Sequence, residues 1–97
     1  MQVSVRFFTR LREITDKREE TLRFQDTEIV TIERVLGTLS ESYGKDFKEY
    51  VYNKKSRKVR SFLQFLVNGR GVPPDAEMNT RLSDGDVLAI VPPVGGG

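Results

Sequence analysis

One stretch of the chain has the hydrophobic period of a long helix, and strand-like segments stand on both sides of it. Its apolar residues recur three and four positions apart, on one helical face, at Ile32, Val35, Leu36, Leu39 and Tyr43. Thr31 is placed to cap the start of this helix and Gly44 to end it. Gly37 interrupts the helix at a cost of about 1 kcal/mol relative to alanine, and either allows close approach to a sheet or is tolerated. Because one helix covers only one face of a sheet, we expect an α+β fold with one main helix packed on one sheet face.

The segments around the helix predict a mixed sheet of about five strands. They are residues 3–7 and 21–24 before the helix, and residues 62–67, 80–82 and 87–91 after it. The first two form a hairpin around a polar turn at 15–17, and Asn68-Gly69 predicts a tight turn after the third. We expect the first and last strands to lie side by side and parallel in the centre of the sheet. The segment 46–60 is weakly periodic and predicts only a short helical turn, at Phe47, Tyr50 and Val51.

Two of the predicted strands are apolar in both phases of the alternation, although the helix covers only one face. They are residues 62–67 and 87–91, and Phe8 extends the first strand in the same way. The outer face of the sheet is therefore either covered by the segment 44–61 or exposed as an apolar patch for a partner. For an exposed patch, the candidate partner-binding residues are Phe8, Phe65 and Leu66.

The chain contains no cysteine and no histidine among its 97 residues. This excludes thiolate nucleophiles, Cys/His zinc sites, disulfides and the usual general base at neutral pH. No serine or threonine stands in a nucleophile-elbow context, and no glycine-rich phosphate loop joins a strand to a helix. We therefore expect no enzyme activity from the chain by itself, no metal site and no stably bound cofactor.

A basic run lies in the second half of the weakly periodic segment, at Lys54, Lys55, Arg57, Lys58 and Arg60. It is either a solvated loop or a surface that steers an acidic partner or RNA. Direct nucleic-acid binding is not expected, because no aromatic residues interleave with these charges and the net charge of the chain is only +2. No apolar run has the length of a membrane span and the N-terminus has no signal-peptide pattern, so we expect a cytoplasmic protein without a membrane partner.

The final residues read Pro92-Pro93-Val94-Gly95-Gly96-Gly97, which divides the chain into a domain at 1–91 and a tail at 92–97. The prolines end the last strand because they cannot donate to its ladder, and the glycines form a narrow, extensible arm. Fully extended, this arm reaches roughly 20 Å. The tail is either a frayed end or an arm that presents the carboxylate of Gly97 to a pocket in another protein.

Three segments together resemble the MoaD family, the small subunit of molybdopterin synthase. They are residues 7–13, 67–69 and 82–97, and the last contains an Asp-Gly-Asp turn, an apolar strand, Pro-Pro-Val and the glycines. The resemblance implies a ubiquitin-like β-grasp fold and a sulfur-carrier function. In that family an adenylating enzyme related to ubiquitin-activating enzymes (MoeB- or ThiF-like) uses ATP to convert the terminal glycine into an acyl adenylate. Sulfur then replaces AMP, and the large subunit MoaE accepts the tail and passes the sulfur to the pterin.

On this chain the resemblance makes Gly97 the residue that carries the adenylate and then the thiocarboxylate, and Gly96 the second residue of the diglycine. Gly95 departs from the family pattern, in which a side chain is common at that position. Related proteins leave two alternatives open: a modifier joined through Gly97 to lysines of target proteins, as in small archaeal modifier proteins, and a sulfur carrier for tRNA thiolation. The thiamine sulfur carrier ThiS is similar but generally shorter, and the segment 44–61 argues against it.

Overall fold

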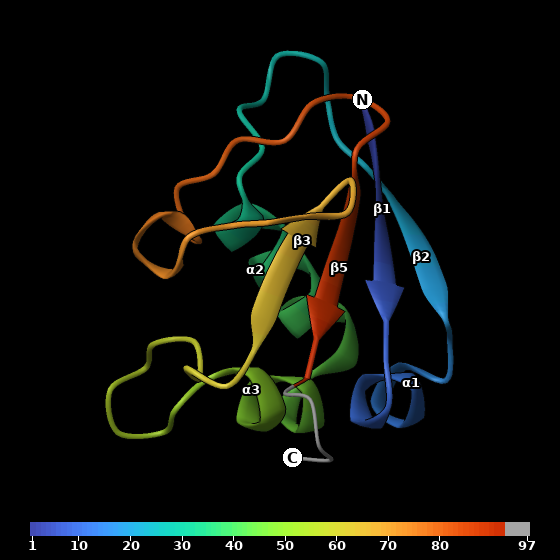
Figure 1. Ribbon diagram of the computed structural model, residues 1–97. Coiled ribbons are helices and arrows are strands. Elements are labelled where there is room, and N and C mark those ends of the chain that lie inside the picture. The colour runs from blue at the N-terminus through green and yellow to red at the C-terminus, as the bar shows by residue number, and fades with distance from the viewer. Residues whose placement is uncertain (93–97) are drawn as a thin grey trace.

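The computed structural model describes residues 1–92, which form a five-stranded mixed sheet with α-helices packed on one face (Figure 1). In chain order the elements are β1 (Gln2–Phe7), α1 (Arg10–Thr15), β2 (Glu19–Arg23), α2 (Ile32–Tyr43), α3 (Lys45–Val51), β3 (Gln64–Val67), β4 (Arg70–Gly71), the 3₁₀ helix η1 (Pro74–Ala76) and β5 (Val87–Val91). The order of strands across the sheet is β2-β1-β5-β3-β4. The predicted α+β architecture is confirmed. No helix within residues 1–92 is long and apolar enough to cross a membrane.

β1 and β5 lie side by side and parallel in the centre of the sheet, as predicted, and the other strand pairs are antiparallel. The hairpin of β1 with β2 is also confirmed. Phe7 of β1 and Phe65 of β3 are both register partners of Ile90, and all three are buried. The inward residues of three strands therefore meet in one apolar layer beneath the helices.

The prediction of a short strand at 80–82 is wrong. That segment forms one isolated bridge, between Thr31 and Arg81, and the fifth strand is β4, which pairs with the end of β3. Asn68 and Gly69 make the turn between β3 and β4 with φ values of 52° and 82°, the positive angles that a two-residue hairpin favours. The turn was visible in the sequence, but a strand of two residues has no alternation by which to recognise it.

The main helix begins and ends where its sequence predicts. The Oγ1 atom of Thr31 accepts a hydrogen bond of 3.2 Å from the backbone N–H of Arg34. At the other end Gly44 has a φ of 71°, and its N–H donates to the carbonyl of Ser40 at 2.9 Å. The predicted apolar face is buried against the sheet at Ile32, Val35, Leu36 and Leu39.

Two shorter helices extend the layer formed by α2. The short turn predicted around Phe47 is a complete helix, α3, whose Phe47 and Val51 are buried in the core. α1 was not predicted; it buries Leu11 and Thr15 and follows Thr9, whose φ is 44°. The Oγ1 atom of Thr15 donates to the carbonyl of Leu11 at 2.7 Å, which satisfies this hydroxyl within the helix.

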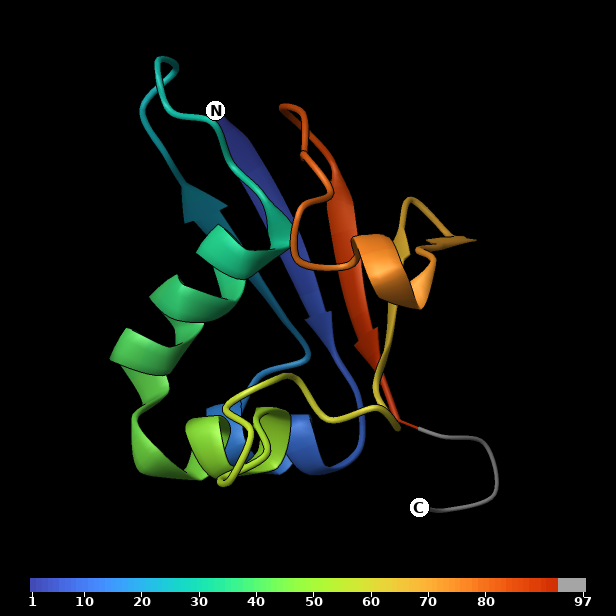
Figure 2. The ribbon, with the colours of Figure 1, turned by 90° about the vertical axis from the view of Figure 1, so that its left-hand side faces the viewer.

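The outer face of the sheet has no helix over it within residues 1–92. α1, α2 and α3 all lie on the other side, as Figure 2 shows. The segment 44–61 does not cover the outer face, because Phe47 and Val51 pack into the core on the helix side. Of the two expectations for the outer face, the structure therefore supports the uncovered surface.

Gly37 does not serve a close approach to the sheet. It lies on the exposed side of α2, and a Cβ atom built there would have no heavy atom within 4 Å. The helix therefore carries the glycine cost without any packing gain inside the described chain.

We expect Gly37→Ala to raise the free energy of unfolding by about 0.5–1 kcal/mol, since alanine favours the helix and meets no neighbour. Urea denaturation followed by circular dichroism measures this change. Gly44→Ala is the control and should lower stability, because its φ of 71° disfavours an L-residue. A loss of stability in Gly37→Ala would contradict the open space around that position.

Candidate functional site

The last strand carries the chain out of the centre of the sheet. Its final register pair is Val91 with Gln64 of β3, at the end of the sheet near α1 and α3 (Figure 1). Pro92 follows, half-buried and without a backbone N–H to continue the ladder. The remaining predicted tail residues lie outside the described residues: Pro93, Val94, Gly95, Gly96 and Gly97.

An apolar strip on the outer face of the sheet runs toward this point. We define the outer strip as Phe8 and Leu66 together with Val87, Ala89 and Val91 of β5, all half-buried. The intervening residues of β5 are buried on the helix side, so the strand alternates between two apolar faces. In the register Ala89 is the partner of both Leu66 and Arg6. Such a row on an uncovered sheet face is typical of a protein-binding surface.

Positive charge borders one end of the outer strip. The guanidinium groups of Arg6 and Arg12 lie 6.0 and 5.4 Å from the centroid of the Phe8 ring. The Nε atom of Arg12 also donates to the carbonyl of Phe7 at 3.0 Å, which fixes this side chain beside the ring. A partner that covers Phe8 thus meets an aromatic ring with two guanidinium groups close to it.

The expectation that Phe65 faces a partner needs correction. Phe65 is only 1% exposed and belongs to the core, whereas its neighbour Leu66 faces outward. The register explains the difference, because Phe65 is paired with the inward residue Ile90 and Leu66 with Ala89. Phe8 and Leu66 remain on the surface, and the structure adds the outward residues of β5 to them.

Most of the basic run forms an exposed turn between Tyr52 and Val59, which make an isolated bridge. The exposed members are Lys54, Lys55, Arg57 and Lys58. Asn53 organises the turn, since its Oδ1 atom accepts the backbone N–H groups of two following residues at 2.9 and 3.2 Å. This turn lies beside α2 and α3, so the structure does not bring it together with the outer strip.

Arg60 does not belong to this exposed charge. Its Nε and Nη2 atoms donate to the carbonyl of Glu49 at 3.2 and 3.0 Å. Arg60 is half-buried, and it satisfies a carbonyl in the last turn of α3. We therefore assign it a structural role.

The described part of the chain does not bring potential metal ligands close together. Residues 1–92 contain no group of three or more acidic, histidine or cysteine side chains able to hold an ion. What they provide is a sheet whose central strand leads to the tail, with an apolar surface beside it.

Comparison with known proteins assigns the chain to a family. The sequence model of the ThiS family matches residues 5–97. The chain belongs to the ThiS family. The match runs through the segment 44–61, so the length of that segment does not separate the chain from this family.

Relatives of this ThiS family member carry several names. A protein of Archaeoglobus fulgidus, provisionally named a sulfur carrier protein, is 33% identical over 72 residues, 74% of this chain and 80% of the relative. Small archaeal modifier protein 3 of Haloferax volcanii is 31% identical over 97 residues, the whole of both chains. A solved structure from Pyrococcus furiosus, provisionally named molybdopterin converting factor subunit 1, has a TM-score of 0.70 at 25% identity and covers 96% of this chain and 98% of that one. The resemblance to MoaD-like proteins and the ubiquitin-like β-grasp fold are confirmed.

Proposed function

We propose that this ThiS family member is a sulfur carrier that is adenylated and then thiocarboxylated at Gly97 and donates its sulfur for molybdopterin synthesis. The observation that carries the proposal is the position of β5, which leads from the centre of the sheet into the glycine tail beside an uncovered apolar strip. The family match through residue 97 and the relative named as a sulfur carrier support it.

The chemistry needs only a carboxylate from this chain. An oxygen of the Gly97 carboxylate attacks the α-phosphate of ATP, pyrophosphate leaves, and an acyl adenylate forms in the pocket of an adenylating enzyme (MoeB- or ThiF-like). A donor of sulfide-level sulfur then attacks the acyl carbon, the bond from that carbon to the AMP oxygen breaks, AMP leaves, and a thiocarboxylate remains. Glycines allow the tail to enter a narrow pocket, and a chain without cysteine has no thiol to attack the activated carbonyl. A MoaE-like large subunit would then accept the tail and transfer the sulfur to the pterin.

The outer strip is the surface that we assign to these partners. It lies on the face without helices and ends at Val91, next to the start of the tail. A partner that covers it is therefore positioned to receive the tail. Because the strip is a single surface, the adenylating enzyme and the acceptor subunit would bind in turn rather than together.

A second function is favoured by one comparison. Small archaeal modifier protein 3 aligns with the whole chain, and its name states that it is a modifier. In that case the ε-amine of a lysine on a target protein attacks the adenylate, AMP leaves, and an isopeptide bond joins Gly97 to the target. Sulfur carriage for tRNA thiolation is a further outcome of the same activated tail.

The intact mass of the protein recovered from its own cells under non-hydrolysing conditions tests the proposal. We expect one oxygen at the C-terminus to be replaced by sulfur, and we expect copurification with a MoaE-like subunit. Lysine adducts that carry the Gly-Gly remnant, with an unmodified free pool, would establish the modifier function instead. A free pool with neither change would overturn both.

Leu66→Glu is expected to weaken binding of the adenylating enzyme at least tenfold, roughly 1.4 kcal/mol, since it places a charge inside the apolar contact. The half-buried position of Leu66 should let the variant fold. Titration of the purified enzyme by isothermal calorimetry measures the change. Thr21→Glu is the control, because Thr21 is exposed on β2, outside the outer strip. Equal losses in both variants would argue against the strip as the contact.

A further inference from the structure

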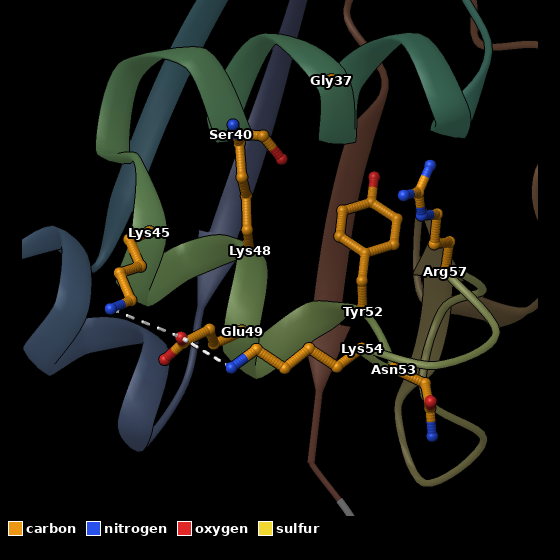
Figure 3. Close-up of a pocket in the computed structure, with 9 residues that line it drawn as sticks. All are labelled: Gly37, Ser40, Lys45, Lys48, Glu49, Tyr52, Asn53, Lys54 and Arg57. Atoms are coloured by element: carbon orange, nitrogen blue, oxygen red, sulfur yellow. Dashed lines mark ion pairs between the residues drawn. The ribbon is translucent and has the colours of Figure 1, made fainter.

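A groove lies on the helix side of the molecule, between α2, α3 and the turn that follows α3 (Figure 3). Its volume is about 740 Å³. Gly37 lies on the α2 wall, and Tyr52 stands in the groove with its hydroxyl pointing toward α2. A tyrosine hydroxyl is neutral at pH 7 at its ordinary pKa, and burial raises the pKa of Tyr52 further. The groove and the outer strip lie on opposite sides of the sheet, which leaves each accessible when the other is occupied.

Cationic side chains predominate around this groove. Lys45, Lys48, Lys54 and Arg57 line it, against the single carboxylate of Glu49. The Oε1 atom of Glu49 lies 3.9 Å from the Nζ atom of Lys45 and 3.8 Å from that of Lys54. Such long, exposed pairs contribute little to stability. The groove therefore complements a ligand with negative charge.

The two inner cations are not engaged by acids of the described chain. Within residues 1–92, neither Lys48 nor Arg57 forms an ion pair. Figure 3 shows them on either side of the Tyr52 ring, with the ends of both side chains directed toward α2. Their charges are thus available to a bound partner.

Besides its positive charge, the groove has a distinctive shape, which Gly37 provides. This glycine stands on the exposed side of α2, and the volume that a Cβ would take is empty. A helix surface without a side chain at this point lets another main chain approach closely. This access would explain a glycine that no contact within the described chain explains.

We propose that the groove is a docking surface for an acidic segment of a partner protein. Its main chain would lie across Gly37, and its carboxylates would pair with Lys48 and Arg57. A protein segment is favoured over a small anion because the groove is open and its cations are spread along α3 and the turn that follows it rather than converging on one point. RNA is disfavoured because, within residues 1–92, Tyr52 is the one aromatic residue that lines the groove, and its ring is partly buried. The proposal does not depend on the chemistry of Gly97.

Fluorescence polarisation of a fluorescein-labelled oligoglutamate, titrated with the full chain at low salt, tests this inference. We expect saturable binding that weakens as salt is added. Lys48→Glu should weaken it roughly tenfold through charge. Gly37→Leu should weaken it to a similar degree through shape, while leaving the helix folded because leucine is a good helix former. Lys55→Glu is the matched control, since it makes the same charge change on the turn that follows α3 but outside the groove lining.

The outcomes separate docking in the groove from general attraction. Binding that resists Lys55→Glu but falls in both groove variants supports the proposal. Equal losses in Lys48→Glu and Lys55→Glu, or full affinity in Gly37→Leu, would overturn it. Tighter binding of oligouridylate than of oligoglutamate would show an RNA surface, and competition by inorganic phosphate at equal charge concentration would show a small-anion site; either would refute a peptide groove.

Discussion

A chain that lacks Gly96 and Gly97 is expected to form no acyl adenylate and to keep the melting temperature of the full chain. Two residues span roughly 7 Å when extended, so the new terminal carboxylate would fall short of the adenylating pocket. Since misplacement by about 1 Å can cost about a hundredfold in rate, activation should fall below detection. The fold should persist, because every core residue in the described part of the chain lies at or before Ile90.

ATP–pyrophosphate exchange with the purified adenylating enzyme measures activation, and thermal unfolding by circular dichroism measures the fold. Gly96→Val should also block activation, since a β-branched side chain widens the arm where the pocket is narrow. Gly95→Ala is the control: a side chain is common at that position in the MoaD family, so this variant should be activated normally. Adenylation of the shortened chain, or its unfolding, would contradict the proposed division between domain and tail.

The parts of the fold that the sequence predicted are those with a local period. The α2 face and the two caps at Thr31 and Gly44 follow from residues within a few positions of one another. The parallel pair of β1 and β5 joins distant segments, but topology leaves few arrangements for a hairpin, one crossover helix and further strands.

The errors occurred where the period is short or degenerate. α1 has only six residues and buries one large apolar side chain, Leu11, so no repeat marks it. β3 belongs to a run that is apolar throughout, so its two phases cannot be told apart until it is paired with β5. This is why Phe65 was assigned to the surface instead of the core.

The candidate site also has one part that local sequence predicts and another part that depends on tertiary packing. The tail was predicted from proline and glycine, whose backbone properties do not depend on neighbours, and it stays a prediction because residues 93–97 lie outside the described residues. The outer strip depends on which face the helices cover, which only tertiary packing decides. Gly37 was visible as a cost to the helix, but its place in a basic groove required knowing that α3 and the turn after it lie opposite.

The role of the segment 44–61 was left open by the sequence; its helix α3 contributes Phe47 and Val51 to the core, and Phe47→Ala is expected to show it. We expect a loss of about 3–5 kcal/mol in the free energy of unfolding, because a fully buried ring is replaced by a cavity. Phe47 is 0% exposed, and its ring lies 6.3 Å from that of Tyr43, between centroids. Urea denaturation at neutral pH measures the loss.

Phe62→Ala makes the same chemical change on a side chain that is 41% exposed, and it should cost about 1 kcal/mol or less. Both variants remove a phenyl ring, so the difference between their losses of stability measures the effect of burial alone. A small domain has a total stability of about 5–15 kcal/mol, so Phe47→Ala can leave too little folded protein to measure. Phe47→Leu, with a smaller loss of about 1 kcal/mol, then provides the reading, and it is compared with Phe62→Leu, which should cost about 0.5 kcal/mol or less because Phe62 is exposed. Similar losses at Phe47 and Phe62 would mean that α3 is a peripheral insertion. A large difference would mean that α3 is held in place by the core, which keeps the basic groove in shape without any partner.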